Sequence, residues 1–167
     1  LGPEELLESR DSPATINGFW SNSAGQVVVM WYQDNGTRVT QYASTLDSST
    51  GSWVRTELGP YSATDVYAVG ALTSSGDFHA YSRSTCRTLR RVNGAWVNPT
   101  ALPAALCSSA VFWAMDNNAN LLAVNGVDGR WASFDARSQT LVQSFVNATP
   151  TTGAGFVLGT RWNSLPG

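Results

Sequence analysis

Residues 18–31 read GFWSNSAGQVVVMW, and residues 111–124 read VFWAMDNNANLLAV. In both stretches Phe-Trp is followed by a polar segment that contains Asn and Ala, and then by a short run of aliphatic residues. A polar turn between two apolar runs is typical of a β-hairpin. Because the same pattern occurs twice in one chain, it predicts an internal structural repeat.

Three segments of the chain align as an apolar strand, a turn containing glycine and a second strand: residues 27–44, 66–83 and 121–137. Their second strands carry an aromatic residue at a matching place: Tyr42, Tyr81 and Phe134. Two segments continue to a Gly-x-Trp that ends at Trp53 or Trp96, whereas the third reaches Leu141. A unit of about 40–50 residues with four short strands is the expected size of a propeller blade.

The expected strands are rich in Val, Tyr, Phe and Trp and are separated by turn residues. They are Gln26–Gln33, Arg38–Ser44, Trp53–Glu57, Val66–Leu72, Phe78–Ser82, Leu89–Val92, Ala110–Ala114, Leu121–Asn125, Trp131–Asp135, Leu141–Val146 and Gly155–Thr160. This pattern predicts an all-β protein of propeller-like antiparallel four-stranded repeats, with about three blades plus terminal strands. A β-sandwich or jelly roll is the alternative, because short strands with frequent turns fit it as well.

We expect a single all-β repeat domain over residues 13–167 that follows an acidic N-terminal arm at residues 1–12. Three blades are too few for an ordinary closed ring, which has about 4–8 blades. Three ways of completing the ring are open. The terminal strands could form a further blade, for example by pairing of residues 153–162 with residues 14–20. Further copies of the chain, or the rest of a longer protein, could also supply the missing blades.

The two cysteines, Cys86 and Cys107, flank a segment that looks long and loop-rich, RTLRRVNGAWVNPTALPAAL. The turn glycines Gly36, Gly76 and Gly129 are unequally spaced, and the surplus length falls where the cysteines lie. A disulfide would close a loop of about 20 residues and stabilise the fold by roughly 3 kcal/mol. We expect this disulfide to brace an insertion; two buried free thiols are the alternative.

The net charge of the 167 residues is only −2, which argues against nucleic acid and anionic membranes as partners. No apolar run approaches a membrane span. Because Ser, Thr, Asn and Gly supply most of the polarity, we expect a secreted, extracellular protein; a cytosolic protein is the alternative. His79 is the only histidine, and with two distant cysteines it makes no zinc site, so we expect neither a metal nor a cofactor.

Carboxylate catalysis would require two acids that face each other across a cleft. The candidates are Asp34, Asp47, Asp65, Asp77, Asp116, Asp128 and Asp135. Nearly all of them lie in turns, where an aspartate caps backbone N–H groups. We therefore expect a protein that is not an enzyme, with a structural role for His79.

Sugar binding requires aromatic platforms and groups that bond to hydroxyls, and the chain is rich in both. The expected ligand-binding residues are Trp53, Trp96, Tyr42, Tyr81, Arg38, Arg83 and Gln41. Trp53 and Trp96 are the best candidates for exposure because they follow turns in matching places. The alternative is that these tryptophans pack between blades, with the indole N–H bonded to a loop carbonyl.

The stretch MWYQDNGTRVTQYASTLDSSTGSW at residues 30–53, and more weakly GDFHAYSRSTCRTLRRVNGAW at residues 76–96, resembles the fucose-binding lectins of the fungal and bacterial six-bladed propeller family. Bacterial propeller repeats of other kinds have a similar pattern. The resemblance implies a ligand between blades, held by an Arg, a Glu and aromatic residues. The residues at the Arg position are Val28, Tyr67 or Leu122, and those at the Glu position are Gln41, Ala80 or Ser133. The family's own fucose-binding pair is therefore replaced.

The leading expectation is a non-enzymatic, lectin-like recognition module that binds glycans. Fucosylated glycans are included only through the resemblance, because the family's fucose-binding pair is replaced. A homo-oligomer is one of the three ways, given above, of completing the ring. The alternative is a protein–protein interaction or assembly module, or an effector. A third hypothesis is a sialidase-like hydrolase fragment, because TLDSSTGSW is similar to the Asp-box turn of sialidases. A lectin would show small repeated clefts, whereas an interaction module would show one continuous patch.

Overall fold

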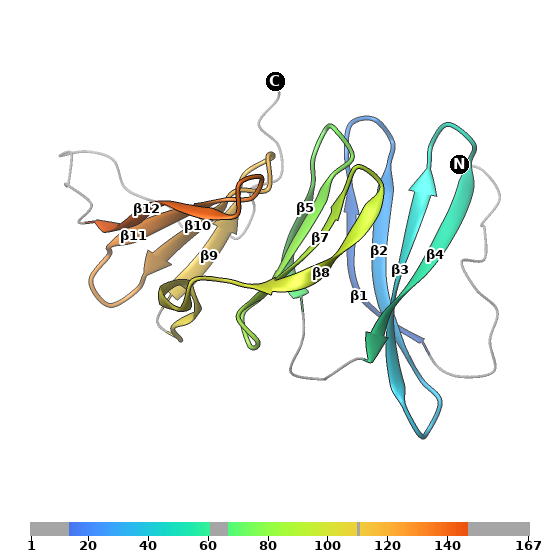
Figure 1. The fold of residues 1–167 in the computed structure, drawn as a ribbon, viewed down its shortest axis with the longest axis horizontal. Helices are drawn as coiled ribbons and strands as arrows, with labels where there is room; N and C mark the ends of the chain where they lie inside the picture. Colours follow the sequence, from blue (N-terminus) through green and yellow to red (C-terminus); the bar gives the residue numbers. More distant parts are fainter. Residues whose placement is uncertain (1–13, 61–66, 110, 147–167) are drawn as a thin grey trace.

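The computed structural model describes residues 14–60, 67–109 and 111–146, which form three antiparallel four-stranded sheets, here called blades (Figure 1). The first blade has the order β1 (Ala14–Ser21), β2 (Val27–Asp34), β3 (Val39–Asp47) and β4 (Ser52–Pro60). The second has the order β5 (Tyr67–Leu72), β6 (Phe78–Ser82), β7 (Arg87–Val92) and β8 (Ala95–Ala101). After the 3-10 helix η1 (Ala104–Cys107), the third has the order β9 (Val111–Met115), β10 (Leu121–Asn125), β11 (Trp131–Asp135) and β12 (Thr140–Val146).

The blades stack side by side through their first strands, because β1 contacts β5 and β5 contacts β9. This arrangement confirms the prediction of an all-β chain with propeller-like four-stranded repeats. Two neighbouring blades taken alone also form the stacked sheets of a sandwich, so the alternative fold describes any such pair. The described strands group into three complete blades, and β1 belongs to the first of them.

The core between the first and second blades is built from alternate residues of facing strands. Met30 on β2 and Phe78 on β6 are fully buried, and Tyr67 on β5 is nearly so. Trp20 on β1 packs against this cluster, with its ring centroid 5.0 Å from that of Phe78. A four-stranded sheet cannot bury a face by itself, so the second blade supplies the apolar surface that covers the first.

The core between the second and third blades is more aromatic. Tyr81 on β6 is fully buried and meets Trp113 and Phe134 edge-on, at centroid distances of 6.4 and 6.2 Å. Its hydroxyl donates a hydrogen bond to the backbone carbonyl of Ala119, 3.0 Å away in the third blade. Burial raises the pKa of the Tyr81 hydroxyl, as expected for a phenol enclosed by apolar side chains. Tyr81 thus joins two blades by both packing and a hydrogen bond.

The turn between the first and second strands is built in the same way in every blade. The backbone N–H of its first residue donates to the carbonyl of its fifth residue: Asn22 to Gln26, Thr73 to Asp77, and Asp116 to Asn120. The side-chain oxygen of the first residue accepts the backbone N–H of the fifth, at 3.0, 3.1 and 2.8 Å. The fourth residue has a positive φ: Gly25, Gly76 and Ala119. The repeated sequence pattern therefore encodes one hairpin turn.

The predicted alignment of the turn glycines is wrong by one strand in the second blade. Gly36 and Gly129 lie between second and third strands, but Gly76 lies between the first and second strands. The second blade makes its next turn with Cys86 at a φ of 54°, so no glycine marks that turn in the sequence. The apparent extra length of the second unit comes from this offset.

The offset decides which aromatic residues correspond to one another. Tyr81 lies on a second strand, whereas Tyr42 and Phe134 lie on third strands, so Tyr81 is not their counterpart. Trp53 and Trp96 do correspond, because each lies two residues after the glycine of the turn between the third and fourth strands.

The segment between the cysteines is a hairpin, and the prediction of a loop-rich insertion there is wrong. β7 and β8 occupy most of it and pair from Val92–Ala95 to Arg87–Ala101. The sequence analysis did not predict β8. This strand contains Pro99, which has no N–H to donate. This is tolerated because β8 is the edge strand of its sheet and the register shifts beside the proline.

Cys86 and Cys107 form a disulfide, as predicted, with their Cα atoms 5.6 Å apart. Cys86 lies in the turn after β6, and Cys107 is the last residue of η1. Both half-cystines pack against the core between the second and third blades. The bond therefore ties the second blade to the connection that leads into the third. The expected arm at residues 1–12 and the expected strand Gly155–Thr160 lie outside the described residues.

Removal of the disulfide by the double substitution Cys86→Ser and Cys107→Ser should lower the free energy of unfolding by roughly 3 kcal/mol, because the unfolded chain gains the freedom of the opened loop. Urea unfolding of both proteins under non-reducing conditions measures the difference. Equal midpoints and slopes for the two proteins would contradict this expectation.

Substitution of Gly70 should disturb the first blade junction, because a Cβ atom there would lie 2.8 Å from the Trp20 indole. We expect Gly70→Ala to lower the free energy of unfolding by about 1–3 kcal/mol. In a Trp20→Phe background the same substitution should cost less, since the smaller ring leaves room for the methyl group. Denaturant unfolding of the four proteins forms a double-mutant cycle, and a zero coupling energy would refute the assigned contact.

Candidate functional site

A depression of about 270 Å³ lies on the side of the third blade that faces away from the second blade. Leu122, Ser133 and Val142 line it. Along their strands these residues alternate with Leu121 and Phe134, which belong to the core toward the second blade. Successive side chains of a strand point to opposite faces, so the depression lies on the end face of the stack.

Turn hydrogen bonds hold the polar edge of this depression. The Asp116 carboxylate accepts the backbone N–H groups of Asn118 (2.9 Å) and Asn120 (2.8 Å), and the Asn120 side-chain amide donates to it (2.9 Å). The Asn120 side-chain oxygen accepts the backbone N–H of Ala136 at 3.1 Å. Asn120 thus fixes the β9–β10 turn against the end of β11.

Asp135 contributes a charged acceptor at the same edge. Its carboxylate accepts hydrogen bonds from the backbone N–H and the hydroxyl of Ser138, the latter at 2.7 Å. These two bonds, the backbone one first, lower the pKa of Asp135 below its ordinary value. The side chain is partly exposed and carries a negative charge at neutral pH.

The depression combines an apolar floor with hydrogen-bond acceptors, which is the chemistry that suits a small polyol. Two carboxylates, those of Asp116 and Asp135, line it, and both already hold turn N–H groups. Hydrogen bonds to Ser138 lower the pKa of Asp135 and favour its charged form, which accepts hydrogen bonds and does not donate them.

Trp53 and Trp96, the tryptophans that the sequence favoured most as exposed binding residues, lie in equivalent places on different blades. Trp96 packs against the core between the first and second blades, edge-on to Phe78 at 5.9 Å. Trp53 packs against Val29 and Trp31 on the far side of the first blade. Both tryptophans are partly buried, and neither lines the depression on the third blade.

The two expected tyrosines are buried. Tyr42 stacks on Trp31 with a centroid distance of 4.5 Å, and the Arg55 guanidinium lies 5.3 Å from the centre of its ring. Tyr81 is enclosed between the second and third blades, as described above. Tyr42 and Trp53 thus belong to one cluster, whereas Tyr81 belongs to another.

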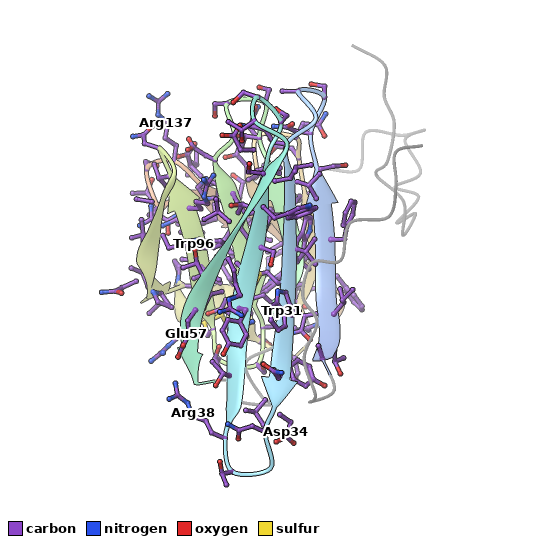
Figure 2. The ribbon with its side chains drawn as sticks, turned by 90° about the vertical axis from the view of Figure 1, so that its right-hand side faces the viewer. Trp31, Asp34, Arg38, Glu57, Trp96 and Arg137 are labelled. Atoms are coloured by element: carbon purple, nitrogen blue, oxygen red, sulfur yellow. A yellow bond between two sulfur atoms is a disulfide. The ribbon has the colours of Figure 1, made fainter. Side chains whose placement is uncertain are left out.

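The three expected polar residues are spread over the chain. Arg38 lies near the tip of the β2–β3 hairpin and forms an exposed ion pair with Glu57 at 3.1 Å (Figure 2). Arg83 donates to the backbone carbonyl of Ser108 at 3.1 Å. Gln41 is buried, and its amide nitrogen has no hydrogen-bond partner among the described residues.

Five of the six described aspartates confirm their predicted role as caps of their own turns. Each accepts a backbone N–H two or three residues along the chain: Asp34 from Gly36, Asp47 from Ser49, Asp116 from Asn118, Asp128 from Arg130, and Asp135 from Ser138. Asp77 instead accepts the N–H of Asn93, in the turn between β7 and β8. Asp65 lies outside the described residues. Turn geometry thus accounts for the carboxylates that the sequence offered for catalysis.

Sequence reasoning missed most of the depression. Leu122 and Ser133 entered only as the residues that replace the sugar-binding pair of the propeller lectins, and Val142 did not enter as a site residue. The sequence did contain a sign that the outer face of this sheet is apolar. Leu122 and Val142 are apolar and alternate with the core residues Leu121 and Leu141. Strands that are apolar on both faces predict contacts on both sides of a sheet.

Three polar side chains lie together on the face of the second blade that meets the third. His79 pairs across the strands with Arg90, and Thr88 pairs with Tyr81. One buried atom of each, His79 Nδ1, Thr88 Oγ1 and Arg90 Nε, has no hydrogen-bond partner among the described residues. Burial, and secondarily the positive charge of Arg90, lower the pKa of His79, against a weaker opposite effect of Asp77. Protonation of His79 is therefore costly in the folded protein.

No protein-family model matches the sequence, and no curated protein matches it. Within residues 14–60, 67–109 and 111–146, no group of three or more His, Cys, Asp and Glu side chains is arranged to hold a metal ion. No helix in that part of the chain has the length and apolar character needed to cross a membrane. Function is therefore inferred from the geometry of the chain itself.

The free energy of unfolding should fall as the pH is lowered from about 7.5 to about 5, since the unfolded chain protonates His79 near its ordinary pKa of 6.5 and the folded chain does so only at lower pH. The stabilisation is complete above that value and is lost as the pH falls toward the lowered pKa. His79→Gln should show a smaller fall over the same range. Urea unfolding at several pH values tests this, and parallel profiles for the two proteins would contradict it.

Proposed function

We propose that this protein is a non-enzymatic recognition module and that it binds a carbohydrate in the depression of the third blade. The observation that carries this proposal is the combination of an apolar floor at Leu122 and Val142 with acceptors at Asn120, Ser133 and Asp135. A pyranose ring presents C–H groups on its faces and hydroxyls at its edge. One ring face would rest on the aliphatic side chains while hydroxyls donate to the acceptors.

The volume of about 270 Å³ is slightly below the usual range of small-molecule pockets, about 300–1,000 Å³, so the ligand would be a single terminal sugar unit. A site of this size binds weakly alone, and multivalent presentation would raise its avidity. The disulfide inside the chain supports an oxidising, extracellular setting in which glycans are accessible.

Protein–protein assembly is a second candidate function, favoured by a separate observation. Large apolar side chains are exposed on the outward faces of both terminal blades: Phe19 is 62% exposed on the first blade, and Phe112 and Val142 are 54% and 68% exposed on the third. Contiguous exposed apolar surface marks interaction sites in soluble proteins.

Asp135→Asn should weaken carbohydrate binding roughly 10- to 100-fold, because it replaces a charged hydrogen-bond acceptor with a neutral one of the same shape. Asp47→Asn is the matched control, since Asp47 also accepts the N–H and hydroxyl of a turn serine, but on the first blade. A broad glycan array identifies the sugar, and titration calorimetry with that sugar compares the three proteins.

We expect Asp47→Asn to bind like the parent protein. Equal losses in both variants would mean that turn stability and not ligand contact is being measured. Folded parent protein that binds nothing on the array would overturn the carbohydrate proposal.

A further inference from the structure

The hairpin between β2 and β3 projects at one end of the first blade, with Asp34 and Arg38 on the two sides of its tip (Figure 2). Residues 34–38 are all exposed to solvent. The three residues between Asp34 and Arg38 are Asn35, Gly36 and Thr37. Asn-x-Thr, with any residue except proline in the middle, is the acceptor motif for N-linked glycans. The hairpin therefore presents this motif to solvent.

The turn brings the threonine hydroxyl of the motif onto the asparagine side chain. Thr37 Oγ1 donates a hydrogen bond to Asn35 Oδ1 at 2.9 Å. The same oxygen accepts the backbone N–H groups of Thr37 and Arg38, at 3.1 and 2.8 Å. Asn35 Nδ2 makes no hydrogen bond to any of the described residues. The side-chain amide is thus held through its oxygen, and its nitrogen is left for reaction.

Gly36 allows the chain to turn tightly between the two motif residues. Its φ is 83°, a conformation that glycine adopts without strain, and its N–H donates to the Asp34 carboxylate at 2.8 Å. A Cβ atom placed on Gly36 would meet no other atom within 4 Å. The space around the tip is therefore open to a bulky group.

We propose that Asn35 is a site of N-linked glycosylation, with a lipid-diphosphate-linked oligosaccharide as the donor and a transferase of the secretory pathway as the enzyme. Asn35 Nδ2 attacks the anomeric carbon of the donor, and a C–N bond forms as the bond from that carbon to the phosphate oxygen breaks. The lipid diphosphate leaves with the bonding electron pair, and one Nδ2 proton passes to a base of the transferase. Donors on Oδ1 stabilise the negative charge that the amide gains as this proton leaves.

The modification is compatible with the fold of the hairpin. A glycosylated Asn35 keeps Oδ1, so the three hydrogen bonds from Thr37 and Arg38 are retained. The glycan breaks no bond at Nδ2, because that atom makes none to the described residues. The depression lies on the third blade, so a glycan on this hairpin of the first blade leaves it uncovered.

Two other segments of the chain read Asn-x-Thr. Asn98 and Thr100 lie on β8 with Pro99 between them, and a proline in the middle excludes glycosylation. Asn147 begins the other segment, which lies outside the described residues. Asn98 therefore provides an exposed internal control, whereas Asn147 has to be removed before the glycan on Asn35 can be measured alone.

This proposal goes beyond carbohydrate binding and rests only on the oxidising, extracellular setting that the disulfide supports. The test is expression of the full chain behind a secretion signal in eukaryotic cells, in an Asn147→Gln background. Protein is collected from the medium and from the lumen of the secretory pathway, so that slow export hides nothing. The intact mass shows whether a glycan is attached.

Digestion with peptide N-glycosidase then converts each glycosylated asparagine into aspartate. Heavy-oxygen water in the digestion labels the new aspartate, which separates it from spontaneous deamidation of Asn35 before Gly36. Peptide mass spectrometry should find the label at residue 35 in most chains and at residue 98 in none. Chains that are not digested provide the background.

Thr37→Val and Thr37→Ser form a matched pair of variants. Valine keeps the branched shape of threonine without the hydroxyl, so the glycan on Asn35 should be lost. Serine keeps the hydroxyl, so the glycan should be retained. Thr37 is exposed, and its hydroxyl contacts Asn35 alone among the described residues, so both variants should fold. Far-ultraviolet circular dichroism and an intact disulfide check this.

Disulfide-bonded parent protein that carries no glycan on Asn35 would overturn the proposal. A glycan that persists on Asn35 in the Thr37→Val variant would overturn the role given to the hydroxyl. Carbohydrate binding is measured on the digested protein, which has no glycan of its own. The glycan titration therefore decides that proposal independently of this one.

Discussion

The close approach of Trp20 to two glycines sets the distance between the first two blades. Its indole lies against Gly18 of its own strand and against Gly70 of β5, and a Cβ atom at either glycine would meet the ring. The first strands therefore approach each other closely enough for Met30 and Phe78 to share one core. Because tightly packed interiors respond to a single methyl group, the stack depends on this contact.

The junction between the second and third blades also brings two sheets into contact, but it does so with different residues. There Trp113 comes from the later blade, and Tyr81 adds a hydrogen bond to the carbonyl of Ala119. Apolar burial is not directional, so different side chains can fill equivalent junctions. The turn between the first and second strands is more constrained, because each blade must satisfy the same backbone groups. The sequence repeat is consequently easier to recognise in the turn residues than in the core residues.

This difference explains what the sequence could predict. Phe78–Ser82, Leu121–Asn125 and Trp131–Asp135 were predicted with the bounds that β6, β10 and β11 have, because each is flanked by turn residues. The sequence alignment of the repeats was wrong by one strand in the second blade, because Cys86 adopts a positive φ where the other two blades have a glycine. β8 was missed because its proline is acceptable only on an edge strand, and edge position is a property of the sheet.

The candidate site was harder to predict than the fold for a related reason. Trp53 and Trp96 are equivalent in sequence, yet only Trp96 lies between two blades of the same chain. Local patterns identify the face on which a side chain lies, but what covers that face depends on the neighbouring blade. The depression arises on the third blade, where Leu122 and Val142 have no following blade among the described residues. The proposed carbohydrate binding and the proposed assembly would therefore use the same surface of the third blade.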